Sequence, residues 1–309
     1  MVFDPQELHD EIRALAAECD AVVLAHNYQR AEVQDVADFV GDSLGLSRQA
    51  ASVDASVIIF AGVHFMAETA KILSPAKTVL MPEPRAGCPM ADMMSAPELA
   101  AWREENPGVP VVTYVNSTAE VKALTDVCCT SANAVQVVRA LVDETGTDRV
   151  LFGPDRNLAN WVARSLPGIE VIPWAGYCPI HDQVTAEQVV AARERHPGAL
   201  AMAHPECRPE VIDLVDAVLS TSQMLAYAAG SSADEFIVIT EEGLIHALAK
   251  AAPGKRFVSL SPPMLCPNMK LTTLEKVRDC LREATGEIEV AEETRVRALS
   301  AVERMVAIG

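Results

Sequence analysis

The chain has 309 residues, of which half are apolar and 22% are charged, and its formal net charge is -18. This length exceeds that of a single small module, and the apolar content excludes an intrinsically disordered protein. The acidic charge argues against nucleic-acid and membrane partners, and no apolar run reaches the roughly 20 residues of a membrane span. Residues 1–15 are acidic and amphipathic, unlike a secretion signal, so we expect a cytoplasmic protein.

Short apolar runs alternate with longer helical patterns along the chain, which is typical of βα units around parallel sheets. Nine strands are predicted in three groups of three: 21–25, 57–61 and 78–81; 109–115, 149–152 and 169–173; 199–203, 235–239 and 256–260. Between these strands the apolar residues recur at helical spacing, for example over 91–105, 131–143 and 272–283.

A threefold internal repeat organises these groups. Cys-Pro dipeptides begin at Cys88, Cys178 and Cys266, spaced 90 and 88 residues apart, and each follows the third predicted strand of its group. The residues 62 positions before them follow the first strands and are His26, Asn116 and His204. Solenoid repeats usually run about 20–50 residues, so units of this length favour separate domains. We predict an α/β fold of three similar, Rossmann-like αβα domains (1–107, 108–197 and 198–309) in a pseudo-threefold triangle around a central active site.

A second motif recurs in each repeat. Glu-Val is followed after four residues by Asp, and a hydroxyl residue comes five positions later, just before a helical pattern. These hydroxyl residues are Ser43, Ser131 and Thr221. They are predicted to be helix N-caps, and three converging helix N-termini would attract carboxylate or phosphate.

The three repeated cysteines are candidate metal ligands. Three thiolates can hold a [4Fe-4S] cluster and leave one iron open, and an open metal position can bind and polarise a substrate atom. A Cys₃His zinc site is the alternative, because Cys178 and His181 have Cys-x-x-His spacing. The cysteines without threefold partners are expected in the core: Cys19, Cys128, Cys129, Cys207 and Cys280.

Polar residues at the first strand ends suit proton transfer and carbonyl chemistry. Imidazoles and a carboxylate can move protons near neutral pH, and phenols can hydrogen-bond a developing oxyanion. The candidates are His26, Tyr28, Tyr114, Asn116, His204 and Glu206. The chain has no Walker loop, no GxGxxG after a strand and no GxSxG, so a nucleotide cofactor and a hydrolase elbow are not supported.

From about residue 21 to the end, the chain resembles the quinolinate synthase family of bacterial and archaeal NAD biosynthesis. The resemblance rests on AHNYQ, GDSLGLS, FMAETAK, AGCPMAD, TYVNST, CTSANA, HPEC, STS and CPNMKLTTLEKV. It implies three αβα domains and one central [4Fe-4S] cluster on Cys88, Cys178 and Cys266. The implied reaction joins iminoaspartate and dihydroxyacetone phosphate into quinolinate, with loss of phosphate and two waters. A functional link to an iminoaspartate-producing enzyme is possible.

The resemblance also assigns residues. It matches the family's active-site tyrosines to Tyr28 and Tyr114 and its catalytic glutamate to Glu206, and we add His204 to this catalytic group. Around substrate and product it places His26, Ser43, Asn116, Ser131, His181 and Thr221. Some members carry Cys-x-x-Cys-x-x-Cys ending at the third ligand. Here Leu260 and Pro263 occupy the earlier positions, so a disulfide switch is not expected.

Two other functions share parts of this pattern. An aconitase-like hydro-lyase would use the same open iron without a phosphate pocket, so activity with dihydroxyacetone phosphate separates it from the synthase. A metal-dependent sensor would bind DNA or a protein partner, which the acidic charge and the lack of a basic helix disfavour.

Overall fold

The computed structural model describes residues 5–309, so the first four residues of the predicted first domain lie outside it. Its strands form three separate sheets, each with four strands and each parallel throughout. Parallel strands require crossover connections, which explains why helical segments separate the strands along the sequence. The predicted α/β fold of three similar units is confirmed.

The three sheets have one topology. In each, the first strand is central, the second lies at one edge, and the third and fourth continue on the other side: β2-β1-β3-β4, β6-β5-β7-β8 and β10-β9-β11-β12. The strands are β1 (Ala21–His26), β2 (Phe39–Gly41), β3 (Val57–Ala61), β4 (Thr78–Leu80), β5 (Val111–Tyr114), β6 (Val127–Cys129), β7 (Arg149–Gly153), β8 (Glu170–Pro173), β9 (Leu200–Ala203), β10 (Ala217–Val218), β11 (Glu235–Ile239) and β12 (Arg256–Ser259).

Helices fill the connections and both ends of the chain. They are α1 (Pro5–Glu18), α2 (Ala31–Val36), α3 (Ser43–Ser52), α4 (His64–Leu73), η1 (Ala91–Met93), α5 (Ala96–Glu105), α6 (Ala119–Lys122), α7 (Ala134–Thr145), α8 (Arg156–Ser165), α9 (Pro179–Asp182), α10 (Ala186–Arg195), α11 (Pro209–Ile212), α12 (Thr221–Gly230), α13 (Leu244–Ala251), α14 (Leu274–Glu283) and α15 (Glu292–Ala307). No helix within residues 5–309 is long and apolar enough to cross a bilayer.

All nine predicted strands exist, but the prediction of three strands per sheet was wrong. Each sheet has a fourth strand at its edge, namely β2, β6 or β10. These strands have only two or three residues, which is too short for a residue pattern to predict. In β2, Phe39 and Val40 are also more than a third exposed, so burial does not mark them either.

The repeated Asp of the Glu-Val-x₄-Asp motif has a structural role. The carboxylate of Asp38 accepts the backbone N–H of Val23 at 2.8 Å. Its counterparts repeat the bond at 2.7 Å, Asp126 to Val111 N–H and Asp216 to Ala201 N–H. Each aspartate lies shortly before the edge strand and bonds near the start of the first strand, which ties the two together. We call these three residues the strand-start aspartates.

The predicted N-caps were each wrong by one or two residues. Asp42 caps α3 by accepting the N–H of Gly45, and Ser220 caps α12 by accepting the N–H of Gln223. Ser43 and Thr221 are therefore the first residues of their helices. Ser131 lies two residues before Asn133, the N-cap of α7. Asp-Ser and Ser-Thr pairs offer two capping side chains in succession, so spacing alone does not identify the cap.

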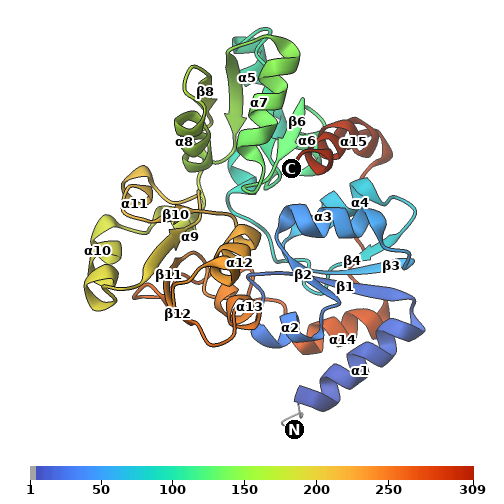
Figure 1. Cartoon of the computed structure of the whole chain (residues 1–309). Helices are drawn as coiled ribbons and strands as arrows, with labels where there is room; N and C mark the ends of the chain where they lie inside the picture. The colour runs from blue at the N-terminus through green and yellow to red at the C-terminus, as the bar shows by residue number, and fades with distance from the viewer. Residues whose placement is uncertain (1–4) are drawn as a thin grey trace.

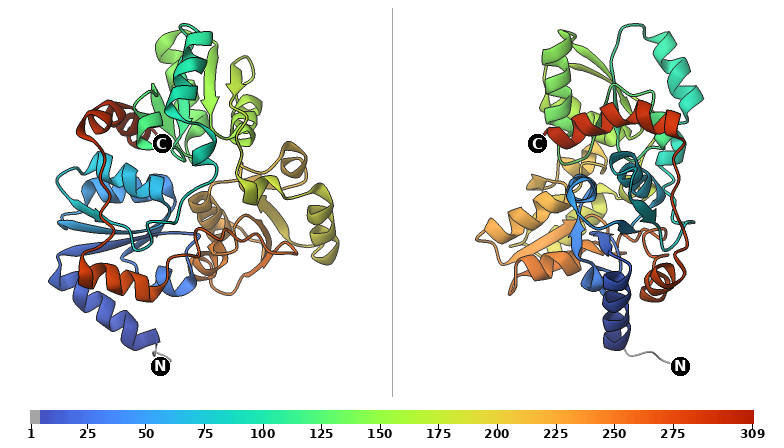
Figure 2. Two further views of the ribbon diagram at one scale, coloured as in Figure 1. Left: turned by 180° about the vertical axis from the view of Figure 1, so that it is seen from behind. Right: turned by 90° about the vertical axis from the view of Figure 1, so that its right-hand side faces the viewer.

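The three sheet units surround a common centre (Figures 1 and 2). One continuous apolar core joins the first and second units and includes α15, whereas the third unit has cores of its own. The C-terminal helix α15, predicted as part of the third repeat, instead packs against α6 and β6 of the second unit and α4 of the first. Likewise α14 packs on α1 and β3. The division at residues 107 and 197 stays a prediction.

Candidate metal centre and active site

A single cavity of about 230 Å³ is lined by residues from all three units. Its walls include the residues that follow the first strands and the loops that follow the fourth strands, because parallel sheets collect side chains at the carboxyl ends of their strands. All thirteen side chains predicted for the site line this cavity: His26, Tyr28, Ser43, Cys88, Tyr114, Asn116, Ser131, Cys178, His181, His204, Glu206, Thr221 and Cys266. Their functional roles remain predictions.

The three repeated cysteines lie on loops that contact one another. Cys88, Cys178 and Cys266 are free, partly exposed thiols on the cavity wall. Asn268 donates a hydrogen bond from Nδ2 to the carbonyl oxygen of Gly87 at 2.8 Å, which joins the third cysteine loop to the first. Trp174 donates from Nε1 to the carbonyl oxygen of Met93 at 2.7 Å, which joins the second to the first.

Burial keeps these thiols protonated while no cation is bound. It raises the pKa of Cys88 to about 12 and raises the pKa of Cys178 and of Cys266. Thiolates are the form that binds metal, so metal binding would release protons here. A soft metal centre fits a set of three thiols from three loops on one cavity. The unrepeated cysteines differ, because Cys128, Cys129, Cys207 and Cys280 are buried in the core and Cys19 is partly exposed.

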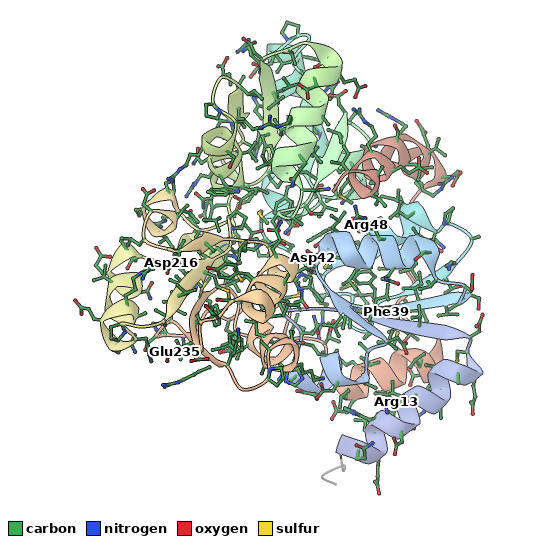
Figure 3. The ribbon with its side chains drawn as sticks, in the orientation of Figure 1. Arg13, Phe39, Asp42, Arg48, Asp216 and Glu235 are labelled. Carbon is green, nitrogen blue, oxygen red and sulfur yellow. The ribbon has the colours of Figure 1, made fainter. Side chains whose placement is uncertain are left out.

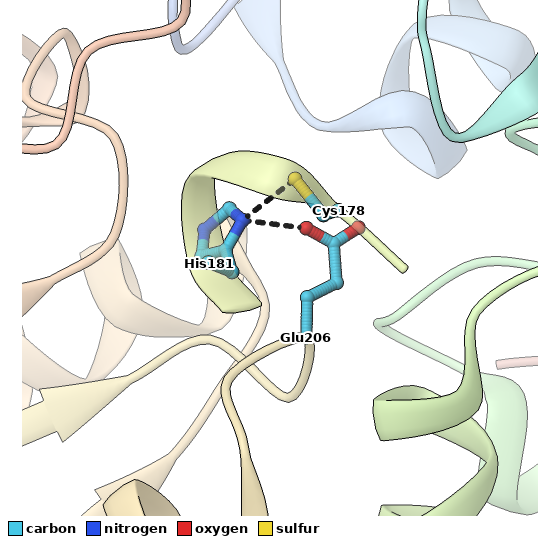
Figure 4. Close-up of side chains that lie close together, drawn as sticks. All are labelled: Cys178, His181 and Glu206. Atoms are coloured by element: carbon cyan, nitrogen blue, oxygen red, sulfur yellow. Dashed lines mark hydrogen bonds and ion pairs between the residues drawn. The ribbon is translucent and has the colours of Figure 1, made fainter. Parts of the chain in front are cut away.

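Glu206 contacts three other side chains of the site. Tyr114 donates its hydroxyl proton to Glu206 Oε1 at 2.8 Å, and His181 Nδ1 lies 2.7 Å from Oε2 (Figure 4). His204 Nδ1 lies 3.4 Å from the same oxygen. Burial opposes ionisation of this carboxyl, but His204 and His181 hold its pKa well below its usual range. Glu206 is therefore an ionised acceptor inside the protein.

His181 also contacts the second repeated cysteine, as Cys-x-x-His spacing predicted. Its Nδ1 lies 3.2 Å from Cys178 Sγ (Figure 4). Ligand atoms of Cys178, His181 and Glu206 all lie within 4.8 Å of one another, so this group can also hold a single metal ion. The site thus offers donors for a metal centre, and the cysteine trio and the Cys178 group share one ligand.

Thr240 is a site residue that the sequence analysis missed. Its hydroxyl oxygen lies 2.5 Å from the hydroxyl oxygen of Tyr28 and 2.9 Å from Nε2 of His181. A hydrogen-bonded series therefore runs from Tyr28 through Thr240, His181 and Glu206 to Tyr114. Thr240 directly follows β11, and the carboxyl ends of parallel strands are where ligands bind. That position was the available signal, but the candidates predicted after strands were those that follow the first strand of each group.

Two histidines occupy equivalent positions in the first and third units. His26 Nδ1 accepts the N–H of Tyr28 at 3.1 Å, and His204 Nδ1 accepts the N–H of Glu206 at 3.4 Å. Burial lowers the pKa of His26 to about 3, so that ring is neutral, and burial also lowers the pKa of His204, whereas Glu206 acts to raise it. His204 Nε2 lies 3.1 Å from the hydroxyl oxygen of Ser131 in the second unit. Each histidine thus holds the residue two positions later in place.

Other residues of the cavity wall offer hydrogen-bonding groups for a ligand. Ser43 and Thr221 begin the ten-residue helices α3 and α12, whose N-termini carry partial positive charge. Asn27 Nδ2 donates to the Thr221 hydroxyl at 2.9 Å and fixes it. The buried Oδ1 of Asn116 has no hydrogen-bond partner among the described residues. A buried amide oxygen without a partner is costly unless a ligand supplies a donor.

The fold and the site define an α/β protein that combines one thiol-bearing loop per unit with a shared cavity rich in proton-transferring side chains. The family model described as "Quinolinate synthetase A protein" matches residues 10–307. The chain belongs to this family.

Curated relatives agree over nearly the whole length. A protein of Thermodesulfovibrio yellowstonii named "Quinolinate synthase" is 52% identical over 299 residues, covering 97% of both chains. A protein with the same name from Dehalococcoides mccartyi (strain CBDB1) is 53% identical over 96% of this chain and 97% of its own length. One from Methanoregula boonei is 51% identical over 99% of both chains. The resemblance stated from the sequence motifs is confirmed.

Proposed function

We propose that this chain condenses iminoaspartate with dihydroxyacetone phosphate and releases quinolinate, phosphate and two waters. Its family membership makes it an enzyme of NAD biosynthesis. The observation that carries the proposal is the convergence of the three cysteine loops and the Glu206 network on one cavity. The reactants are anions, and the same cavity contains the starts of α3 and α12.

We assign Cys88, Cys178 and Cys266 as the ligands of a [4Fe-4S] cluster. Three thiols suit this cluster, which leaves one iron free for an oxygen or nitrogen atom of the substrate. When bound, the cluster would supply Lewis acidity that makes neighbouring C–H and O–H groups easier to deprotonate. All eight cysteines are free thiols in this structure, so the three proposed ligands are not engaged in disulfides.

Glu206 is assigned the proton transfers of the condensation and dehydration steps. Its Oε2 is ionised and takes up a proton from substrate, while His181 Nδ1 donates a hydrogen bond to the same oxygen. Burial and the nearby Glu206 raise the pKa of Tyr28 and of Tyr114, so both phenols remain protonated. Tyr114 donates to Glu206 and Tyr28 contacts Thr240, and each hydroxyl group would turn to a developing oxyanion when substrate is bound. His26 and His204 orient Tyr28 and Glu206.

The anionic parts of substrate and product are assigned to hydrogen-bond donors on the cavity wall. Ser43, Ser131 and Thr221 provide hydroxyl groups there, and Asn116 offers its Nδ2 as a donor, while its buried Oδ1, which has no partner within residues 5–309, would accept a hydrogen bond from a substrate N–H or O–H. A phosphate or the two carboxylates of quinolinate would bind near the first turns of α3 and α12. Iminoaspartate is chemically labile, so a separate enzyme would have to produce it close by.

The decisive experiment measures iron, sulfide and quinolinate formation on anaerobically purified protein. We expect Cys88→Ala, Cys178→Ala and Cys266→Ala each to abolish both cluster retention and product. Cys128→Ala and Cys280→Ala change thiols in the apolar core and are expected to keep both. Full activity in any of the first three variants would remove that cysteine from the ligand set, and activity without dihydroxyacetone phosphate would favour a hydro-lyase.

Glu206→Gln tests the assigned proton transfer separately. The amide keeps the shape of the side chain but cannot take up the proton, so turnover should fall by about 100-fold or more. Iron content should equal that of the wild type, because Glu206 is not assigned as a ligand. An unchanged kcat would remove Glu206 from catalysis.

A further inference from the structure

Two buried carboxylates contact the main chain of two of the three repeated cysteines. Asp155 Oδ2 accepts the backbone N–H of Cys178 at 3.1 Å. Glu241 Oε1 accepts the backbone N–H of Cys266 at 3.0 Å. Both side chains belong to fully buried residues. A buried carboxylate costs free energy unless its oxygens are satisfied, so such a pair is expected to have a specific role.

The second oxygen of each carboxylate binds the turn from which the residue comes. Asp155 Oδ1 accepts the N–H of Leu158 at 2.7 Å and so caps α8. Glu241 Oε2 accepts the N–H of Gly243 at 2.8 Å, and Lys270 Nζ, from the loop of Cys266, lies 3.0 Å from Oε2 and 2.9 Å from Oε1. Each carboxylate therefore joins the turn after one strand to a cysteine-bearing loop.

The two residues hold equivalent places in their units. Asp155 lies two residues after the end of β7, and Glu241 lies two residues after the end of β11. The cysteines that they contact follow the neighbouring strands β8 and β12. In the first unit the corresponding residue after β3 is Val63, which has no carboxylate. The arrangement thus recurs in two of the three units.

We propose that Asp155 and Glu241 are positioning residues for the metal centre, which fix the loops of Cys178 and Cys266 so that both thiolates point at the same group. Within residues 5–309 their oxygens contact N–H groups and Lys270, so we assign both residues to orient ligands rather than to bind the metal. The inference rests on the proposed metal centre at the cysteine trio. Loss of a residue that supports a metal ligand typically lowers metal affinity by about 10- to 100-fold.

The test uses Asp155→Asn and Glu241→Gln in the full chain with its iron centre assembled. Each amide keeps the side-chain shape but has one acceptor oxygen in place of two, so one of the two bonded loops is released. We expect iron to pass to a chelator about 10- to 100-fold faster than from the wild type, followed by loss of visible absorption under anaerobic conditions. Thermal unfolding of each variant is recorded to show that it is folded.

Asp216→Asn is the matched control. It makes the same change in a strand-start aspartate that bonds Ala201 at the beginning of β9, the end of the sheet opposite the cavity. The control is expected to lose iron at the wild-type rate. Wild-type rates in both folded Asp155→Asn and folded Glu241→Gln would overturn the inference. If one of these two variants does not fold, the rate of iron loss from the other variant tests the inference. A wild-type protein that holds no iron would instead overturn the proposed metal centre.

Discussion

The hydroxyl group of Thr240 joins side chains from the first and second sheet units. His181 directs Nδ1 at Glu206 Oε2, 2.7 Å away, and Nε2 at the Thr240 hydroxyl oxygen, 2.9 Å away. The same hydroxyl oxygen lies 2.5 Å from that of Tyr28. These contacts fix both the His181 ring and the Tyr28 phenol at the cavity wall.

Replacement of Thr240 tests whether its hydroxyl group positions His181 and Tyr28. Thr240→Val keeps the shape and removes both hydrogen bonds, so Tyr28 and His181 lose their shared partner. We expect kcat to fall by about 10- to 100-fold with unchanged iron content, since small displacements of catalytic groups are costly. Thr240→Ser restores the hydroxyl group and should recover most of kcat. Equal rates for the Val and Ser variants would contradict the assignment.

The strand-start aspartates act at the scale of the element. An edge strand of two or three residues forms few backbone hydrogen bonds, and a carboxylate that holds the preceding turn to the first strand compensates for this. The second and third units extend the arrangement, because Arg103 and Arg193 pair with Asp126 and Asp216 at 2.9 and 2.7 Å. The strand-start aspartates therefore stabilise the equivalent edge strand in each of the three sheets.

Asp38→Ala removes one of these bonds without touching the cavity. The N–H of Val23 loses its acceptor, and we expect the free energy of unfolding to fall by about 1–3 kcal/mol. Asp54→Ala changes an exposed aspartate of the same unit and should stay within about 0.5 kcal/mol of the wild type. Equilibrium unfolding in urea measures both. A loss at Asp38 no larger than at Asp54 would show that the bond adds nothing to stability.

At the scale of the whole molecule, the C-terminal segment connects the first two units. Arg48 of α3, labelled in Figure 3, lies next to the C-terminal segment. It donates from Nε and Nη2 to the carbonyl oxygen of Val306 at 3.0 and 2.9 Å, and from Nη2 to that of Gly309 at 2.9 Å. Asn133 Nδ2, at the start of α7, donates to the carbonyl oxygens of Met305 and Ile308 at 3.0 and 2.8 Å. The end of α15 is thus bound from both sides.

Arg48→Ala is expected to loosen this connection. The last carbonyl groups of α15 lose their charged donor, which should lower the free energy of unfolding by about 1–2 kcal/mol. Amide hydrogen exchange should also become faster in α15, while β9–β12 of the third unit should be unaffected. Arg13→Ala, at an exposed position of α1 (Figure 3), is the control and should change neither quantity. Unchanged exchange in α15 of the Arg48 variant would contradict the prediction.

Much of the site was predictable because the chain repeats. Cys88, Cys178 and Cys266 were found from their spacing, and they line the same cavity because equivalent loops follow equivalent strands. Thr240 and the two carboxylates Asp155 and Glu241 were not found, since no residue of the first unit matches their chemistry. Their roles depend on which loops the fold brings within about 3 Å of each other, a distance that residue spacing does not contain.

The order of apolar runs and the threefold spacing determined the fold class, the central strands and the cysteine trio, because apolar periodicity and residue spacing are properties of the sequence itself. Tertiary structure alone decided the edge strands, the packing of α14 and α15 away from the third unit, and the hydrogen-bonded series through Thr240. These features arise between segments up to about 270 residues apart, where the energy of a contact depends on geometry that only the folded chain provides.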